Sequence, residues 1–346
     1  MKGRNYGIDF LKSFSMLMIV MLHVLGVGGI LAGQGNYPPA GTADWLLETA
    51  NMCAVNCFGL VSGYVLCRGR YRRSRIVSLW LRVVFESLVV TVLFAVFMPG
   101  STQRHDWICV FTPVLHNIYW YFTAYFALFF FVPYINKMLA TLTDREMTLL
   151  ALSTVFLFTI MQNFANLDLF NLNGGYSFLW LLCLYILGAY LRRTDPGKNI
   201  KSFWFLAGYF LCVIIAWALM KFLNNSNMIS YVSPFILLAA VFLLLFFRRL
   251  PFSPSAPHKF VSMLSRTSFG VYIIHTNPLI WRNLLTDAFT FYRGFPVPIT
   301  ILTVMLTAVA IYAVCTLGDW LVEKLFRLAR IDLLEAAIDR IGKNVA

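Results

Sequence analysis

The sequence predicts an all-α polytopic membrane protein with about ten transmembrane helices and both termini in the cytoplasm. Of its 346 residues, 60% are hydrophobic and only 12% are charged, which is too apolar for a soluble globular chain. The apolar residues also form long stretches, and one helical crossing of a hydrocarbon core about 30 Å thick needs roughly 20 of them. We expect spans near residues 10–32, 45–67, 76–98, 118–137, 147–165, 176–191, 202–223, 231–247, 267–285 and 298–320.

The distribution of Lys and Arg supports this fold class, because the cytoplasmic loops of membrane proteins are enriched in both residues. With the N-terminus inside, the predicted cytoplasmic segments hold most of the basic residues, including the run Arg68–Arg75. The predicted outer segments hold only Arg104, Lys221, Arg282 and Arg293. This asymmetry fits ten spans and two cytoplasmic termini. It also accounts for the net charge of +13 without a nucleic-acid partner.

The two ends of the chain can be interpreted separately. Lys2 and Arg4 precede an apolar run that exceeds the h-region of a signal peptide, about 7–15 residues, so we expect an uncleaved first span. Residues 1–320 would form one ten-span membrane domain, because the loops leave no room for a separate soluble domain. Residues 321–346 mix charged residues with Leu and Ile at helical spacing, which predicts an amphipathic tail helix along the cytoplasmic surface.

The seven cysteines are scattered, with neither a CxxC pair nor a Cys/His spacing typical of a metal site. Cys53 and Cys57 share a helix face, where small core residues are the simplest interpretation. The sequence therefore predicts no disulfide framework and no bound metal.

The first span carries two ionisable residues in an otherwise apolar stretch, Lys12 and His23. Eleven positions separate them, which returns to within roughly 20° of the same helix face about 16 Å along the axis. A snorkelling lysine and a histidine bonded to a neighbouring helix would explain both residues. Because an ionisable group at bilayer depth is costly, His23 is equally a candidate for a functional site.

Two further spans place polar groups at similar depth. Arg82 and Glu86 lie four residues apart, so they can pair on one helix face. His275 lies near the midplane of the ninth span, just before Asn277 and Pro278. If these spans are neighbours of the first, His23, Glu86 and His275 would share one pocket suited to general acid/base chemistry. Alternatively, Glu86 only neutralises Arg82 and His275 only bonds a neighbouring helix.

The loop after the second span is the densest charge run, with five arginines in eight residues. Topology explains part of this enrichment, and guanidinium groups also bind phosphate oxygens in a bidentate manner. A phosphorylated cofactor that enters from the cytoplasm fits the run, and anionic lipid headgroups are the alternative. On the outer side, polar and aromatic residues such as His116, Trp120 and Asp168 would suit either a membrane-interface belt or a sugar.

The chain resembles the acyltransferase type 3 family, integral-membrane enzymes that O-acylate cell-surface carbohydrates and related acceptors. The resemblance covers almost the whole chain and depends on five segments that occur in the family's order. These are GIDFLKSFSMLMIVMLH at 7–23, FGLVSGYVL at 58–66, RRSRIVSLW at 72–80, HNIYWYFTAYFALFFFVPYINK at 116–137 and LSRTSFGVYIIH at 264–275. The family's first helix carries an arginine, ten residues and then a histidine. Here Lys12 takes the arginine's place, which keeps the cation and loses the forked geometry.

The resemblance implies a donor, acyl-coenzyme A from the cytoplasm, and roles for particular residues. His23 would be the catalytic histidine, and His275 would assist or position it. Lys12, Arg72, Arg73 and Arg75 would contact the coenzyme phosphates. The depth argument alone adds Glu86 to the catalytic group and Arg82 to the cofactor-binding group.

The expected function is that of a bacterial inner-membrane O-acyltransferase, an O-acetyltransferase in the first instance. Its acceptor would be a hydroxyl of a surface polysaccharide or of a lipid-linked glycan precursor. The chain lacks the esterase-like and racemase domains of some relatives, so it would act alone or pass the acyl group to a separate protein. The alternative from another class is a non-catalytic transporter or flippase of a small solute or lipid-linked sugar. The two weakly similar halves with broken helices that would favour transport are not found.

Overall fold

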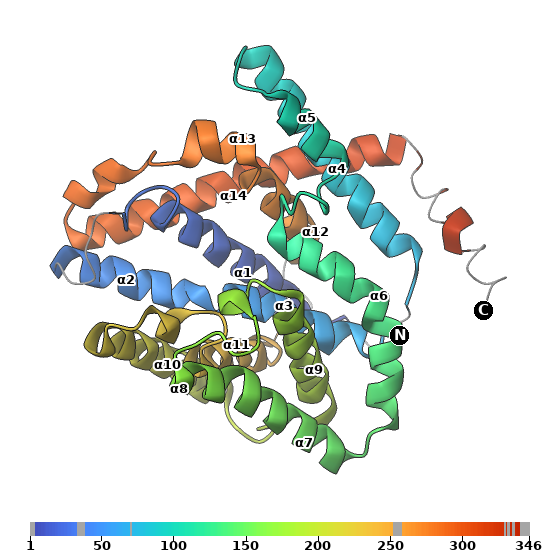
Figure 1. Cartoon of the computed structure of the whole chain (residues 1–346), viewed down its shortest axis with the longest axis vertical. Helices are drawn as coiled ribbons and strands as arrows, with labels where there is room; N and C mark the ends of the chain where they lie inside the picture. Colours follow the sequence, from blue (N-terminus) through green and yellow to red (C-terminus); the bar gives the residue numbers. More distant parts are fainter. Residues whose placement is uncertain are drawn as a thin grey trace.

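The computed structural model describes residues 4–32, 39–69, 71–251, 258–328, 330, 333 and 336–339 (Figure 1). Within these residues the fold is entirely helical. The α-helices are α1 (Tyr6–Leu25), α2 (Pro39–Met52), α3 (Ala54–Leu66), α4 (Ser74–Phe97), α5 (Arg104–Phe111), α6 (Trp120–Thr141), α7 (Asp144–Val155), α8 (Gln162–Ala165), α9 (Phe178–Thr194), α10 (Ser202–Leu223), α11 (Pro234–Phe247), α12 (His258–His275), α13 (Pro278–Ile280) and α14 (Val297–Leu328). Short 3₁₀ or π segments are η1 (Phe156–Met161), η2 (Asn173–Gly175), η3 (Ser226–Ile229), η4 (Trp281–Leu285) and η5 (Thr290–Gly294).

Eight helices in the described part of the chain are long and apolar enough to cross a membrane. They are Tyr6–Leu25, Thr42–Leu66, Ser74–Phe97, Trp120–Thr141, Asp144–Ala165, Ser202–Leu223, Ser226–Phe247 and Val297–Leu328. The predicted class of all-helical, multi-pass membrane protein is thus confirmed, whereas the count of ten is not. The other two predicted spans are helical as α9, which has 17 residues, and α12, which carries Lys259 and Arg266. The cytoplasmic location of both termini stays a prediction.

Helix α1 is the centre of the bundle. It contacts α2, α3, α11, α12 and α14, and 72% of its most apolar stretch is buried inside the protein. Asn5 caps its first turn by accepting a hydrogen bond from the backbone N–H of Ile8 at 3.2 Å. Its central place in Figure 1 agrees with its polar side chains, because Asp9, Ser13 and Ser15 are buried there away from lipid.

The peripheral helices, in contrast, are largely exposed on the outside of the bundle. Only 33% of the apolar stretch of α4, α6 or α10 is buried, and 22% of that of α14. Large apolar side chains stand on their outer surfaces, for example Phe97 at 76% and Phe222 at 80% exposure. Such an apolar exterior is suited to contact with lipid tails, which are themselves apolar.

Helices α3 and α9 approach each other through glycine. A β-carbon at Gly63 would lie 1.9 Å from the carbonyl oxygen of Tyr185, and one at Gly188 would lie 2.1 Å from that of Leu60. Backbone contact of this kind is typical of small residues between membrane helices. It positions α3, which supplies one wall of the cavity described below.

We expect Gly63→Ala to destabilise the protein, because the added methyl group must push α9 away. Overpacking of this type costs about 1–3 kcal/mol. Gly69→Ala is the matched control, because its β-carbon would meet its nearest neighbours at an ordinary 3.5 Å. Thermal unfolding in detergent, followed by size-exclusion chromatography, should show a lower midpoint only for Gly63→Ala. Equal midpoints for the two variants would contradict the proposed helix contact.

The predicted tail begins inside α14, which continues to Leu328. Most of the chain after it lies outside the described residues, so the amphipathic tail helix stays a prediction. A short helical turn is described at 336–339. Its Asp339 contacts the start of α4, as discussed below.

Candidate active site

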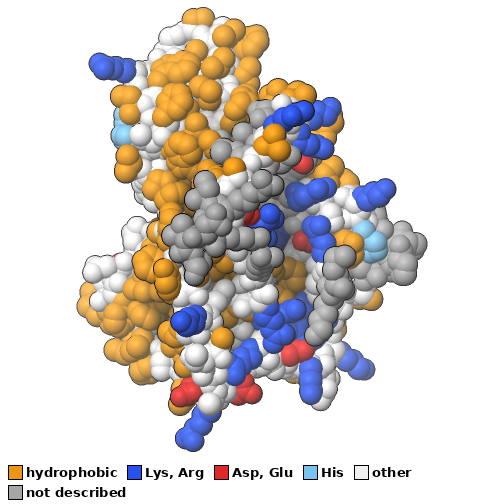
Figure 2. Space-filling view, turned by 90° about the vertical axis from the view of Figure 1, so that its right-hand side faces the viewer, with side chains coloured by type: hydrophobic (Ala, Val, Ile, Leu, Met, Phe, Trp, Pro, Cys, Tyr) orange, Lys and Arg blue, Asp and Glu red, His pale blue; other side chains and the backbone are white. Residues whose placement is uncertain are grey.

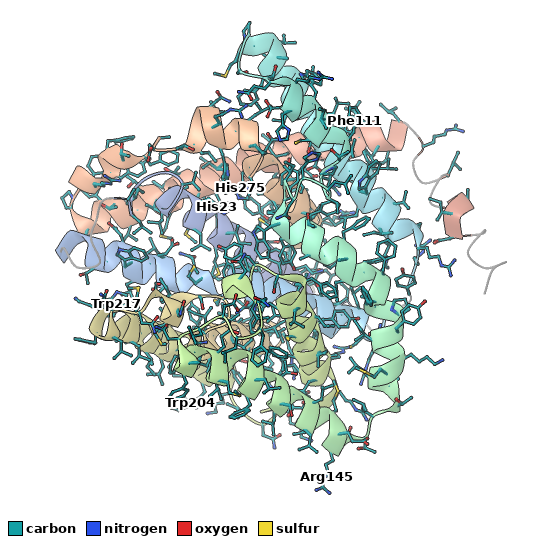
Figure 3. All side chains as sticks on the ribbon, in the orientation of Figure 1. His23, Phe111, Arg145, Trp204, Trp217 and His275 are labelled. Atoms are coloured by element: carbon teal, nitrogen blue, oxygen red, sulfur yellow. The ribbon has the colours of Figure 1, made fainter. Side chains whose placement is uncertain are left out.

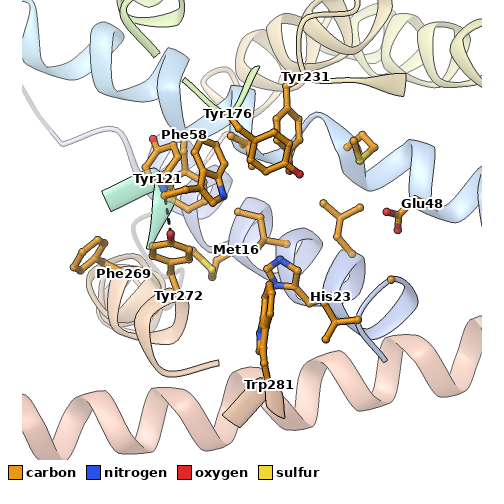
Figure 4. Close-up of a pocket in the computed structure, with 17 residues that line it drawn as sticks. Met16, His23, Glu48, Phe58, Tyr121, Tyr176, Tyr231, Phe269, Tyr272 and Trp281 are labelled. Atoms are coloured by element: carbon orange, nitrogen blue, oxygen red, sulfur yellow. Dashed lines mark hydrogen bonds between the residues drawn. The ribbon is translucent and has the colours of Figure 1, made fainter. Parts of the chain in front are cut away.

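A cavity of about 500 Å³ lies beside the second half of α1. Its wall combines residues from distant parts of the sequence, including His23 on α1, Glu48 on α2, Phe58 on α3, Tyr121 on α6 and Trp281 on η4 (Figure 4). Most of the lining is apolar or aromatic, with few polar groups. A mostly apolar cavity with a few converging polar groups is the usual form of a small-molecule site.

His23 and His275 lie in contact beside this cavity, and of the two only His23 lines it (Figure 3). Nδ1 of His23 lies 2.9 Å from Nε2 of His275. Nδ1 of His275 lies 2.5 Å from the carbonyl oxygen of Val271, one turn earlier on α12. The two contacts form one chain of hydrogen bonds that ends at the backbone.

The carbonyl oxygen of Val271, at the end of this hydrogen-bond chain, determines which ring nitrogens carry protons. A carbonyl oxygen only accepts hydrogen bonds, so Nδ1 of His275 carries a proton. In a neutral imidazole the other nitrogen, Nε2, then accepts, so Nδ1 of His23 must donate to it. Nε2 of His23 is therefore unprotonated and keeps a free lone pair. His23 lines the cavity and is thereby prepared to take up a proton or to attack a carbon.

The sequence after His275 explains how the pair is held. Asn277 and Pro278 end α12 and begin α13, where the Asn277 side chain accepts from the backbone N–H of Leu279 at 2.9 Å. The Asn277 amide donates to the Tyr119 hydroxyl at 3.0 Å. The next segment places the Trp281 ring 5.1 Å from the His23 ring, edge to face. These contacts fix the chain directly after His275.

Three aromatic rings form a second wall of the cavity. The ring of Trp120 lies 4.6 Å from that of Tyr176 and 6.1 Å from that of Tyr231, and it is nearly parallel to the latter. The buried Asn56 amide donates to the Tyr231 carbonyl at 2.8 Å and accepts from the Trp180 indole at 3.0 Å. This contact holds the base of the wall in place.

Glu48 is a cavity residue that the sequence analysis missed. It lies on α2, and its Oε2 atom is buried without a hydrogen-bond partner among the described residues. A buried, unpaired carboxylate oxygen is costly, so it is a natural partner for a polar ligand. In the sequence, Glu48 is an acidic residue near the start of an apolar span. Acidic residues are common at such positions, near the membrane interface, so it did not stand out.

Glu86 and Arg82 lie in a different cluster. Nε of Arg82 donates to Glu86 at 2.9 Å, and a second guanidinium nitrogen contacts Asp319 on α14. Both carboxylates are fully buried. The structure brings His23 and His275 into contact and places Glu86 in this separate cluster, and neither Glu86 nor His275 is among the residues that line the cavity. The sequence analysis identified the Arg82–Glu86 pair and overlooked Asp319, near the end of the last span.

The predicted phosphate-binding arginines lie at the start of α4. Arg72, Arg73 and Arg75 are exposed there. Figure 2 shows a face of the molecule on which Lys and Arg side chains gather. Arg73 borders a second cavity, of about 700 Å³, with Trp80 and Phe126. The basic loop therefore adjoins a groove with apolar walls.

A carboxylate already occupies part of this basic site. Asp339 accepts from Nε of Arg72 at 2.9 Å and from the backbone N–H of Ser74 at 3.2 Å. Desolvation of Asp339 opposes its ionisation, but these hydrogen bonds outweigh that effect and hold its pKa below the usual value. The tail thus presents an anion where a helix begins beside an arginine, an arrangement that also suits a phosphate.

Lys12 lies on the same helix as His23, partly buried, and does not line the cavity. Among the described residues, no carboxylate lies within ion-pair distance of its amino group. Its contact with the coenzyme phosphates stays a prediction.

Comparison with known proteins agrees with the resemblance seen in the sequence. A family model described as an acyltransferase domain matches residues 5–317. No curated protein and no solved structure gives a significant match. The match to the family model includes all the helices that build the cavity, from α1 to η4. Because it covers nearly the whole chain, this protein belongs to the acyltransferase type 3 family.

Proposed function

We propose that this membrane acyltransferase transfers a short acyl group, acetyl in the first instance, from acyl-coenzyme A to a hydroxyl group, with His23 as the catalytic residue. The hydrogen-bond chain from Val271 through His275 to His23 carries this proposal. It leaves an unprotonated nitrogen beside a cavity of suitable size, which is what a general base or a nucleophile requires.

Nε2 of His23 would act first as a general base and then, once protonated, as a general acid. Nε2 of His23 takes the proton of the acceptor hydroxyl while the oxygen forms a bond to the thioester carbonyl carbon. The carbon–sulfur bond then breaks, and the imidazolium returns the proton to the departing thiolate. His275 accepts a hydrogen bond from Nδ1–H throughout and so stabilises the imidazolium. A covalent route, with an acyl-imidazole at Nε2, would use the same lone pair.

The donor would bind at the basic face. Arg72, Arg73 and Arg75 would contact the coenzyme phosphates, with Lys12 as a further cation. Arg82, which the sequence analysis added to this group, is instead paired with Glu86 and Asp319. The ring of Tyr125 stacks on that of Tyr121, which lines the His23 cavity. An acyl path from the basic loop to His23 would pass along these two rings.

The acceptor would enter the aromatic side of the cavity. The rings of Trp120, Tyr176 and Tyr231 suit stacking against a sugar, and the free oxygen of Glu48 suits a hydroxyl donor. A surface polysaccharide or a lipid-linked glycan precursor in a bacterial inner membrane fits this chemistry. A separate acyl-accepting protein would be an alternative recipient.

The experiment uses purified protein in nanodiscs with acetyl-coenzyme A and candidate glycans, and it measures free thiol release. We expect release that increases when a suitable acceptor is added. The transporter hypothesis makes the opposite prediction, namely saturable uptake into vesicles without coenzyme A. Uptake together with no binding of coenzyme A would overturn the proposal.

The tail contact gives a separate prediction. Asp339→Asn should strengthen coenzyme A binding, because the anion that competes for Arg72 is lost. The contact between Asp339 and Arg72 is exposed to solvent and screened by salt, so the gain in affinity should be small. Arg72→Ala should weaken binding, and equilibrium titration with labelled coenzyme A measures both changes. Weaker binding by Asp339→Asn would show that the tail does not compete with the donor.

A further inference from the structure

Three metal-ligating side chains converge at α5, away from the His23 cavity. His105 and Cys109 lie four residues apart on this helix, and His116 follows in the turn after it. One ring nitrogen of each histidine and the thiol sulfur lie within 4.8 Å of one another. In Figure 1, α5 projects above α13, at the far end of α4 from the basic loop. From this cluster we propose that His105, Cys109 and His116 form a zinc site.

The hydrogen bonds of the cluster leave lone pairs for a metal. Nδ1 of His116 lies 3.3 Å from the carbonyl oxygen of Thr112, which only accepts, so this nitrogen carries a proton. The Thr112 hydroxyl donates to the Ile108 carbonyl at 2.6 Å and therefore accepts from the same nitrogen at 2.9 Å. Nε2 of His116 is consequently unprotonated. A hydrogen bond that fixes the tautomer in this way is typical of zinc-binding histidines.

The other two ligands are already in contact. Sγ of Cys109 lies 3.3 Å from Nε2 of His105, and the thiol is the donor if that nitrogen is unprotonated. Bonds of about 2.3 Å to sulfur and 2.0–2.1 Å to nitrogen place tetrahedral ligands about 3.5 Å apart. Zinc would take the place of the thiol proton, which leaves to solvent as the zinc–sulfur bond forms. The ligand atoms now lie within 4.8 Å of one another, so the exposed histidine rings would rotate to close the set around the metal.

The donor set favours zinc over a hard cation. One sulfur and two imidazole nitrogens suit a borderline-soft ion, whereas Mg²⁺ and Ca²⁺ prefer oxygen. Asp106, the neighbouring carboxylate, is already bound to Arg282 at 3.0 Å and to the backbone N–H of Gln103 at 2.8 Å. Three protein ligands therefore leave a fourth position for water.

The location suggests what zinc would do. The metal would tie α5 to the turn that leads into Tyr119, whose hydroxyl bonds Asn277 near the end of α12. His105 and Cys109 also border a cavity of about 150 Å³ that Tyr119 and Asn277 line. A bound zinc ion would thus fasten the segment that covers the end of α12. The inference stands without the proposed acyl transfer.

The test is metal content, which needs no activity. Untagged protein in detergent is loaded with Zn²⁺, freed of excess by gel filtration and analysed by mass spectrometry. We expect about one zinc per chain in the wild type. Loss of an outer-shell partner alone costs about 10–100-fold in metal affinity. Cys109→Ser and His116→Ala each remove a ligand, so their zinc affinity should fall by at least about 100-fold. Thr112→Val removes the hydroxyl that accepts a hydrogen bond from His116, and its zinc affinity should fall by about 10–100-fold.

Two matched variants serve as controls. Cys67→Ser removes a partly buried thiol, and His258→Ala removes a histidine of α12, and both should bind zinc as the wild type does. Loading with Co²⁺ adds a spectroscopic readout, a sulfur-to-cobalt charge-transfer band that Cys109→Ser abolishes. His116 is exposed, so His116→Ala should fold even if Cys109→Ser does not. No zinc in the wild type, or equal zinc in His116→Ala, would overturn the proposal.

Discussion

Replacing His23 with alanine should reduce the turnover number for acyl transfer by about 10²–10⁴-fold, the usual contribution of a general base. The loss should appear in kcat, because the lone pair of Nε2 acts on the reacting hydroxyl rather than on donor binding. Coenzyme A affinity and the thermal unfolding midpoint should stay near the wild-type values. The measurement is thiol release from acetyl-coenzyme A in nanodiscs, together with labelled coenzyme A binding.

Substitutions of His275 should also lower kcat, by an amount that depends on whether the new side chain accepts a hydrogen bond from His23. His275→Ala removes the acceptor for Nδ1–H of His23 and should lower kcat, whereas His275→Gln offers an acceptor oxygen and should recover part of it. His258→Ala is the matched control, because His258 lies at the opposite end of α12 and stacks on Tyr6. Full activity of His23→Ala would contradict its assignment as the catalytic residue.

Arg82→Ala should destabilise the protein by about 3–5 kcal/mol, the cost of leaving buried charges without their partner. The reason is the pair of buried carboxylates, Glu86 and Asp319, that face this one guanidinium. Yield of folded protein and the unfolding midpoint in detergent should both fall.

A compensated variant separates this explanation from a role in donor binding. Arg82→Met combined with Glu86→Gln and Asp319→Asn removes all three charges and should recover most of the stability, because neutral replacement of a buried ion cluster is often tolerated. If Arg82→Ala instead keeps the wild-type stability and raises KM for acyl-coenzyme A, then Arg82 binds the donor.

The sequence was sufficient for the fold class because one physical requirement dominates it. Each span must be long and apolar, and this requirement is visible without any tertiary contact. Tertiary detail was less accessible. Helix α9 lies against α3 through Gly63 and Gly188, and such backbone contact leaves little trace in hydropathy. The number of spans was uncertain where a helix is short, as in α9, or starts with charged residues, as in α12.

The candidate site was accessible to the extent that its residues are unusual in a membrane. His23 and His275 stand out because imidazoles are costly at bilayer depth. The sequence placed them at similar depth, but it did not show that their spans are neighbours. Glu86 stands out for the same reason, yet depth alone does not say which neighbours a residue has. Glu48 and Asp319 lie near span ends, where acidic residues are ordinary.

The cluster at α5 shows a different limit of sequence analysis. His105 and Cys109 have the spacing of one helical turn, but His116 joins them only because the chain turns back after Thr112. Spacing rules for metal sites compare residues along the chain, and here the third ligand follows from a loop conformation.

The measurement that tests the central claim most directly is the protonation state of the His23 ring. The chain has five histidines, so nitrogen NMR of protein labelled with ¹⁵N-histidine gives few signals, and His23→Ala and His275→Ala identify the relevant ones. We predict a proton on Nδ1 of His23, none on its Nε2, and a proton on Nδ1 of His275. A proton on Nε2 of His23 would leave the cavity without a base and contradict the account.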